Sequence, residues 1–128
     1  MTCRVQLFFA GISGLLAVAL GAFGAHALKA RLAPELYAAY QTGVEYQFYH
    51  TLALLLVVVM RQQHDLLPLR WSAWTFIAGI LLFCGSLYVL ALSGVGALGM
   101  ITPLGGLLLL CGWGCLVVAA YFYTRGDD

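Results

Sequence analysis

Charged residues are scarce in this sequence. Only 9% of the 128 residues are Asp, Glu, Lys or Arg, whereas 63% are hydrophobic, and the mean hydropathy is +0.97. A soluble domain carries about 25% charged residues. A water-soluble surface cannot be built from this composition, so the sequence predicts a protein whose solvent is the lipid bilayer. The net charge of +1 provides no basic field, and no nucleic-acid partner is expected.

The sequence also lacks the signatures of enzymes and metal sites. Its four cysteines, at positions 3, 84, 111 and 115, form no C-x-x-C pair, and the last three lie in apolar segments where cysteine packs as a small hydrophobe. No H-E-x-x-H motif, nucleophile elbow or phosphate-binding loop occurs. We therefore predict a protein that is not an enzyme and holds no metal and no cofactor.

Four long apolar runs fill the chain, at roughly residues 5–27, 43–60, 71–92 and 101–123. Each is long enough to cross a bilayer as a helix. The sequence thus predicts an all-α integral membrane protein, a four-helix bundle in a single domain over residues 1–128. Between the first two spans, Pro34 and Glu35 suit the first turn of a helix. We expect a short amphipathic helix here in the membrane interface, with a plain loop as the alternative.

Small residues recur every three or four positions in the first run, at Ala10, Gly14, Ala17, Gly21 and Ala25. This spacing lets a neighbouring helix approach closely, and close packing is a main source of helix association in membranes. The pattern predicts that the first helix packs tightly on another helix.

The positive charges near the helix ends predict the orientation. With four spans, Arg4, Arg61, Arg70 and Arg125 share one side of the membrane with both termini, whereas Lys29 and Arg31 lie on the other side. Loops on the cytoplasmic side carry the excess of Lys and Arg. We therefore expect both termini in the cytoplasm.

Polar side chains gather in the outer half of the predicted bundle. Every span contributes to that half, and the second span begins polar before it becomes an unbroken apolar run. The inner half, at residues 52–60, 75–82 and 107–120, is almost wholly apolar. We expect the polar cluster to face into the bundle as a candidate ligand-binding site. Its members are His26, Glu45, Tyr46, Gln47, Tyr49, His50, Ser86, Tyr88 and Thr102.

Three explanations of this cluster remain open. The first is a hydrogen-bonded layer that fixes the register and depth of the helices. The second is a small-molecule or proton site in which Glu45 and His50 titrate. The third is a haem held by His26 and His50, although His26 lies near the surface and no second pair of histidines exists. We favour the first.

Four blocks of the chain resemble one known family. They are GAFGAHALK at 21–29, QTGVEYQFYHTLAL at 41–54, GSLYVLAL at 85–92 and LGMITPLGGL at 98–107. In these blocks the chain is similar to the YgdD-like membrane proteins, known as domain of unknown function 423, with a eukaryotic branch called transmembrane protein 256. Tyr40 stands where that family usually has tryptophan, and Gly43 where alanine is common.

The resemblance implies a four-helix protein of the bacterial inner membrane with no established activity, so no catalytic residue carries over. We therefore expect a structural or accessory protein that self-associates as a homo-oligomer in the lipid bilayer and has possible membrane-protein partners. The alternative is a small transporter or channel-like protein that uses the polar cluster as a pocket.

Overall fold

The computed structural model describes residues 2–123, and within them four helices are long and apolar enough to cross a membrane. This confirms the predicted fold class. The elements in chain order are α1 (Thr2–Phe23), the π-helical turn η1 (Gly24–Leu28), α2 (Pro34–Gln63), α3 (Leu67–Gly79), the π-helical turn η2 (Ile80–Cys84), α4 (Gly85–Ser93), the 3-10 turn η3 (Gly96–Met100) and α5 (Thr102–Tyr123). Arg125, which entered the orientation argument, lies outside the described residues.

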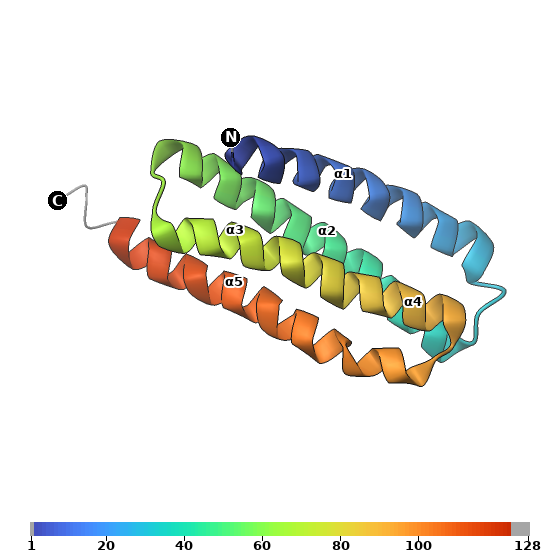
Figure 1. Cartoon of the computed structure of the whole chain (residues 1–128). Helices are drawn as coiled ribbons and strands as arrows, with labels where there is room; N and C mark the ends of the chain where they lie inside the picture. The colour runs from blue at the N-terminus through green and yellow to red at the C-terminus, as the bar shows by residue number, and fades with distance from the viewer. Residues whose placement is uncertain (1, 124–128) are drawn as a thin grey trace.

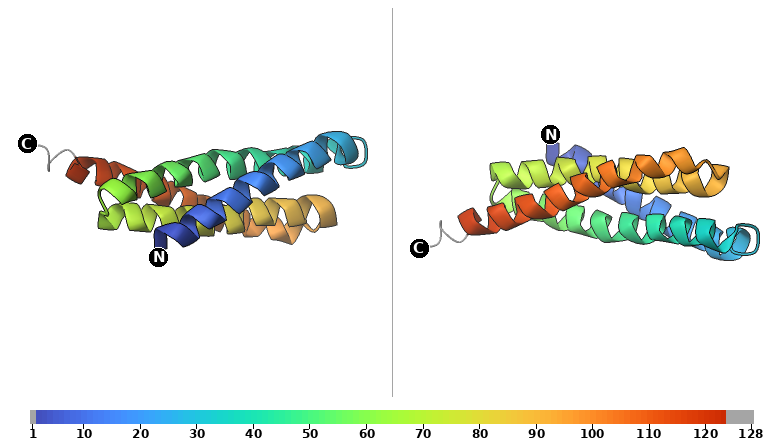
Figure 2. Two further views of the ribbon diagram at one scale, coloured as in Figure 1. Left: turned by 90° about the horizontal axis from the view of Figure 1, so that it is seen from above. Right: turned by 90° about the horizontal axis from the view of Figure 1, so that it is seen from below.

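The helices run antiparallel in sequence order, and the N-terminal end of α1 and the C-terminal end of α5 lie at the same end of the bundle (Figure 1). Helix α2 and the continuous rod α3–η2–α4 form the inner pair. Helix α1 packs mainly on α2, and α5 packs on α3 and η2. Viewed at 90° to Figure 1, α1 crosses the inner pair obliquely (Figure 2). About 44% of each inner span is buried inside the protein, against 22% of each outer span, so α1 and α5 present most of their apolar surface to lipid.

The predicted interfacial helix is not a separate element. Ala33 has an extended backbone, Pro34 occupies the first helical turn, and the helix then continues without a break to Gln63. Proline supplies the helical φ and needs no amide hydrogen-bond partner at this position, so it starts α2 about nine residues before the predicted span. The amphipathic residues are thus the first turns of α2, which extends the span beyond the hydrocarbon.

A dry core joins the inner pair to both outer helices. Leu54, Val57 and Val58 of α2 and Leu69 and Phe76 of α3 are fully buried, and Ala10 of α1 and Leu109 of α5 reach the same cluster. Leu28, Tyr40 and Ala91 form a second, smaller cluster. The larger cluster fixes how α2 and α3 face each other.

The small residues of α1 pack against α2, as their spacing predicts. Ala10 and Ala17 are buried, and a Cβ added to Gly14 or Gly21 would stand 3.7 Å from Thr51 Cγ2 or 3.3 Å from Val44 Cγ1. Ala25 is exposed, so it does not extend the stripe. Helix α1 therefore lies along α2 at ordinary packing distance at Gly14 and more tightly at Gly21.

The contact between α5 and the α3–η2 rod is closer. A Cβ added to Gly105 would overlap the backbone nitrogen of Phe83, and one added to Gly79 would lie 2.5 Å from Leu109 Cδ2. Backbones can approach this closely only where no side chain intervenes, which is why small residues dominate such membrane contacts. Glycine at position 105 therefore sets the distance between α5 and η2.

We predict that Gly105→Ala destabilises the protein by about 1–3 kcal/mol, because the added methyl must push two backbones apart. The measurement is the free energy of unfolding in mixed micelles. Gly114→Ala is the matched control on the same helix, since no atom lies within 4 Å of its added Cβ. Equal stability of the two variants would contradict the close contact.

Candidate functional site

Buried polar side chains in residues 2–123 join one helix to another. Each of them forms a hydrogen bond with a side chain or a backbone carbonyl of another helix. For example, Ser72 Oγ on α3 donates to the Gly112 carbonyl of α5 at 2.9 Å. The set is Gln6, Ser13, Gln47, His50, Thr51, Arg61, Ser72 and Ser86. In hydrocarbon an unpaired polar group costs several kcal/mol, so such bonds select a single helix register.

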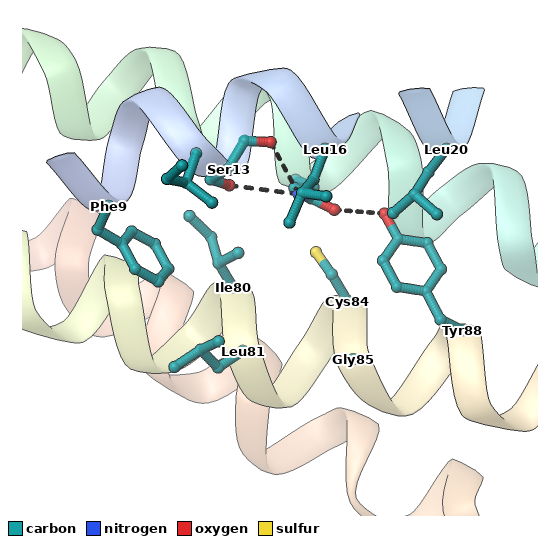
Figure 3. Close-up of a pocket in the computed structure, with 11 residues that line it drawn as sticks. Phe9, Ser13, Leu16, Leu20, Ile80, Leu81, Cys84, Gly85 and Tyr88 are labelled. Atoms are coloured by element: carbon teal, nitrogen blue, oxygen red, sulfur yellow. Dashed lines mark hydrogen bonds between the residues drawn. The ribbon is translucent and has the colours of Figure 1, made fainter. Parts of the chain in front are cut away.

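The central network links α1, α2 and α4. Ser13 Oγ and Thr51 Oγ1 are 2.7 Å apart, and Gln47 Nε2 donates to the Ser13 carbonyl at 2.9 Å and to Ser13 Oγ at 3.3 Å. Tyr88 Oη donates to Gln47 Oε1 at 2.5 Å. Ser13 and Tyr88 reach toward the same region from opposite walls (Figure 3). Gln47 thus bridges α1 and α4, which otherwise stand apart.

A cleft lies over this network, between α1 on one side and η2 and α4 on the other (Figure 3). Its volume is about 230 Å³, and its polar lining comes from Ser13, Gln47 and Tyr88. The apolar walls include Ile12, Leu16 and Leu81, whose side chains are also exposed on the outside of the bundle. The cleft therefore opens sideways, toward the hydrocarbon of the bilayer.

The π-helical turn η2 shapes one wall of the cleft. Its residues Ile80, Leu81 and Cys84 all line the cavity. A π-turn inserts one extra residue into an α-helix, which shifts the register of the side chains on either side, and such turns are frequent at functional sites. The same π-turn contacts α5 through Phe83 and lines the cleft with Ile80, Leu81 and Cys84.

His50 lies outside the cleft and faces α5. Its Nδ1 is 2.7 Å from the Tyr46 carbonyl, and Trp113 Nε1 donates to its Nε2 at 3.1 Å. Nε2 must therefore be the acceptor, and Nδ1 carries the proton donated to the carbonyl, which assigns the neutral tautomer. Both ring nitrogens are engaged, so His50 is placed as a link between α2 and α5.

The structure divides the nine predicted site residues into separate groups. Gln47 and Tyr88 meet in the central network, and Ser86 Oγ lies 2.7 Å from Thr102 Oγ1 between α4 and α5. The expectation that the whole cluster faces into the bundle is wrong, because four members are exposed. They are His26, Glu45, Tyr46 and Tyr49.

Helix geometry explains this division. Successive residues of α2 are rotated by about 100°, so the face that buries Gln47 and His50 turns Glu45 and Tyr49 outward. His26 is exposed in η1 and lines none of the cavities that involve His50. The two histidines thus do not share a pocket, and the geometry does not fit a haem between them. Within residues 2–123 no three His, Cys, Asp or Glu side chains gather as metal ligands.

A second polar cluster at the opposite end of the bundle was not predicted. Arg61 Nη1 donates to Gln6 Oε1, Arg61 Nε donates to Asp65 Oδ1 at 2.9 Å, and Arg70 Nη2 donates to Asp65 Oδ2 at 2.7 Å. These bonds tie α1, α2 and α3 together. The hydrogen bonds from Arg70 and then Arg61 lower the pKa of the Asp65 carboxyl, which lies in the connection between the spans.

Two features of the sequence indicate this cluster once the fold is known. Gln6 is the earliest polar residue on the buried stripe of α1 that continues through Ala10, Ser13 and Ala17. Arg61, which follows the predicted span 43–60, is instead inside α2 and only 5% exposed. The inner half of the bundle is therefore not wholly apolar, because its end carries the buried guanidinium of Arg61, which pairs with the exposed Asp65.

An apolar layer separates the two polar networks. Ser13 lies two turns beyond Gln6 on α1, about 10 Å further along the axis. Between them Leu54, Val57 and Val58 fill the interior, each fully buried. On α2 the buried residues between the two networks are thus apolar, and on α3 the buried Ser72 hydroxyl at this depth is bonded to the Gly112 carbonyl.

Comparison with known proteins gives a consistent result. The family described as "Protein of unknown function (DUF423)" matches residues 20–106. The chain is 45% identical over 125 residues to the UPF0382 inner membrane protein YgdD of Escherichia coli (strain K12). The aligned region covers 98% of this chain and 95% of that protein. It is 40% identical over 121 residues to the UPF0382 membrane protein YwdK of Bacillus subtilis (strain 168), covering 94% and 98%. No solved structure matches.

We predict that Tyr88→Phe lowers the free energy of unfolding by about 0.6–1.7 kcal/mol, between the average and the largest value for hydrogen bonds between membrane helices. The variant keeps the ring but removes the donor to Gln47, the bond that joins α2 to α4 beneath the cleft. Tyr49→Phe serves as the control, because Tyr49 is 55% exposed. Equal losses in both variants, measured by unfolding in mixed micelles, would show that the bond to Gln47 does not hold the helices together.

Proposed function

The chain belongs to the DUF423 family of membrane proteins, whose activity is unknown, and on this premise we propose that it is a structural or accessory protein of the bacterial inner membrane that acts as a homo-oligomer. The observation that carries the proposal is the use of the buried polar groups. They hold the helices to one another and leave little that could react with a substrate. Such a chain serves as a rigid membrane element for copies of itself or for other membrane proteins.

We also propose that the protein is not an enzyme, and the placement of its two candidate acid–base residues, Glu45 and His50, supports this. His50 uses both ring nitrogens within the fold, and Glu45 faces outward, away from it. A general base must lie within hydrogen-bond reach of both a substrate proton and the group that orients it. Neither residue meets this condition in the described structure.

The alternative, a small transporter or channel, has less support. A polar solute would need a continuous polar route across the bundle, and the fully buried Leu54, Val57 and Val58 interrupt the polar side chains of α2 between Thr51 and Arg61. A route between chains would require an oligomer, and this again makes self-association the first property to test.

Self-association is supported by a groove on the outer side of α3 and α5. The groove has a volume of about 480 Å³ and is lined by Trp71, Cys111, Gly114, Cys115 and Val118, among others. No atom lies within 4 Å of a Cβ added to Gly114. Small residues on a lipid-facing helix allow a second helix to approach closely, so we assign this groove as the contact between copies.

Oxidative crosslinking in native membranes tests the contact, because Cys111 is exposed on this face. We expect copper-phenanthroline to produce a covalent dimer that disappears in Cys111→Ser and weakens in Gly114→Leu. Cys84→Ser is the matched control, since Cys84 is buried elsewhere and its loss should leave the dimer unchanged. A protein that stays monomeric by native mass spectrometry and yields no dimer would refute the homo-oligomer.

The proposed orientation has both termini in the cytoplasm. It is supported by Arg4, Arg61 and Arg70 at the end shared by the start of α1 and the end of α5, against Lys29 and Arg31 at the other end. We predict that green fluorescent protein fused to the C-terminus is fluorescent, whereas a fusion inserted between Lys29 and Arg31 is dark because it is exported unfolded. The reverse pattern would invert the orientation.

A further inference from the structure

The central network holds one more hydrogen than it uses. Ser13, Thr51, Gln47 and Tyr88 carry five N–H and O–H hydrogens between them, and the four hydrogen bonds of the network use four. The remaining hydrogen belongs to the hydroxyl of Ser13 or of Thr51. Within residues 2–123 neither hydroxyl makes a further hydrogen bond.

Three other helical hydroxyls of this protein have no such spare hydrogen. Thr42, Thr75 and Ser93 each donate to the carbonyl one turn back in their own helix, which is the ordinary way to satisfy such a group in a helix. Ser13 and Thr51 instead face each other at 2.7 Å. When Thr51 donates to Ser13, the Ser13 proton is left without an acceptor. Ser13 lines the cleft, so that proton is available to a molecule within it.

The depth of the cleft restricts what can enter. Ser13 lies 11 residues into the span that begins at Thr2, about 17 Å along the helix, and hence near the centre of a hydrocarbon core about 30 Å thick. A phospholipid headgroup stays at the interface, and an ion at this depth is costly. The opening between Ile12, Leu16 and Leu81 leads only to lipid. The occupant must therefore be neutral and dissolved in the membrane.

We propose that the cleft between α1 and α4 binds a neutral, membrane-dissolved molecule that has an apolar body and a carbonyl-type oxygen, and that Ser13 donates the hydrogen bond to this oxygen. The apolar walls hold the body, and the spare hydroxyl proton recognises the oxygen. The site uses α1, α2, η2 and α4, whereas the groove assigned to self-association lies on α3 and α5. Its test is thus independent of the proposed function.

A matched pair of probes tests this recognition. Undecan-2-one labelled with carbon-13 at its carbonyl and undecane have the same chain length, and only the ketone can accept a hydrogen bond. In the full-length protein in maltoside micelles, we expect the ketone to raise the thermal unfolding midpoint more than the alkane does. The labelled carbonyl should also show an infrared band at lower wavenumber than the same ketone in empty micelles.

Two variants separate the donor from its neighbour. Ser13→Ala should weaken ketone binding about five-fold, the loss of one neutral hydrogen bond, and should abolish the shifted band. Thr51→Val keeps the shape of Thr51 and leaves Ser13 free to donate, so the band should persist. An unshifted band in the unmodified protein, or a band lost in Thr51→Val but kept in Ser13→Ala, would overturn the assignment to Ser13.

A third variant tests the location. Gly85 lines the cleft, and no atom lies within 4 Å of a Cβ added to it, so Gly85→Val should fold and fill the cavity. We expect it to lose the ketone-induced rise in the unfolding midpoint, whereas Gly11→Val, equally open but lining neither the cleft nor the groove, should keep it. Retention of the effect in a folded Gly85→Val protein would place the ketone elsewhere and refute the proposed site.

Discussion

Pairing of polar groups in hydrocarbon is the constraint on which this bundle depends. Lipid offers no partner to a buried hydroxyl, amide or guanidinium, so each must find one on another helix. Gln6 with Arg61, Ser72 with Gly112, Ser13 with Gln47 and Ser86 with Thr102 do so at successive depths. Each pair forms in only one register, so the set determines how far every helix is shifted along its neighbour, which apolar contacts alone leave free.

The two outer helices are held in different ways, and the cleft results from this difference. Helix α5 meets the α3–η2 rod almost backbone to backbone at Gly105, so no side chain fits between them at that point. Helix α1 lies on α2 without a backbone-to-backbone contact at Gly14 or Gly21 and is linked to α4 by hydrogen bonds through Gln47 and Tyr88. The gap between α1 and α4 is therefore spanned by a polar bridge and lined by apolar side chains, an arrangement suited to a membrane-dissolved molecule.

The central network of Ser13, Thr51, Gln47 and Tyr88 thus holds helices together and also forms the floor of the proposed binding site. Its bonds join three helices, which makes the floor of the cleft rigid, and its single unused hydrogen lies beside Ser13 near the centre of the bilayer. A rigid donor in a medium of low dielectric constant recognises an acceptor with little reorganisation. The ion-pair cluster of Arg61, Asp65 and Arg70 lines none of the cavities described above and closes the end of the bundle.

Composition and run length by themselves determined the four spans and the all-α membrane fold, because only helices bury their own backbone bonds in lipid. The stripe of Ala10, Gly14, Ala17 and Gly21 also indicated the packing face of α1. The sequence could not decide which polar residues of α2 face inward, since Glu45 and Gln47 lie two positions apart and α2 can turn either face to its neighbours. Contacts from α1, α4 and α5, distant in sequence, selected Gln47 and His50. Tertiary structure also opened the cleft and brought Gln6 to Arg61, because both depend on how far apart whole helices pack.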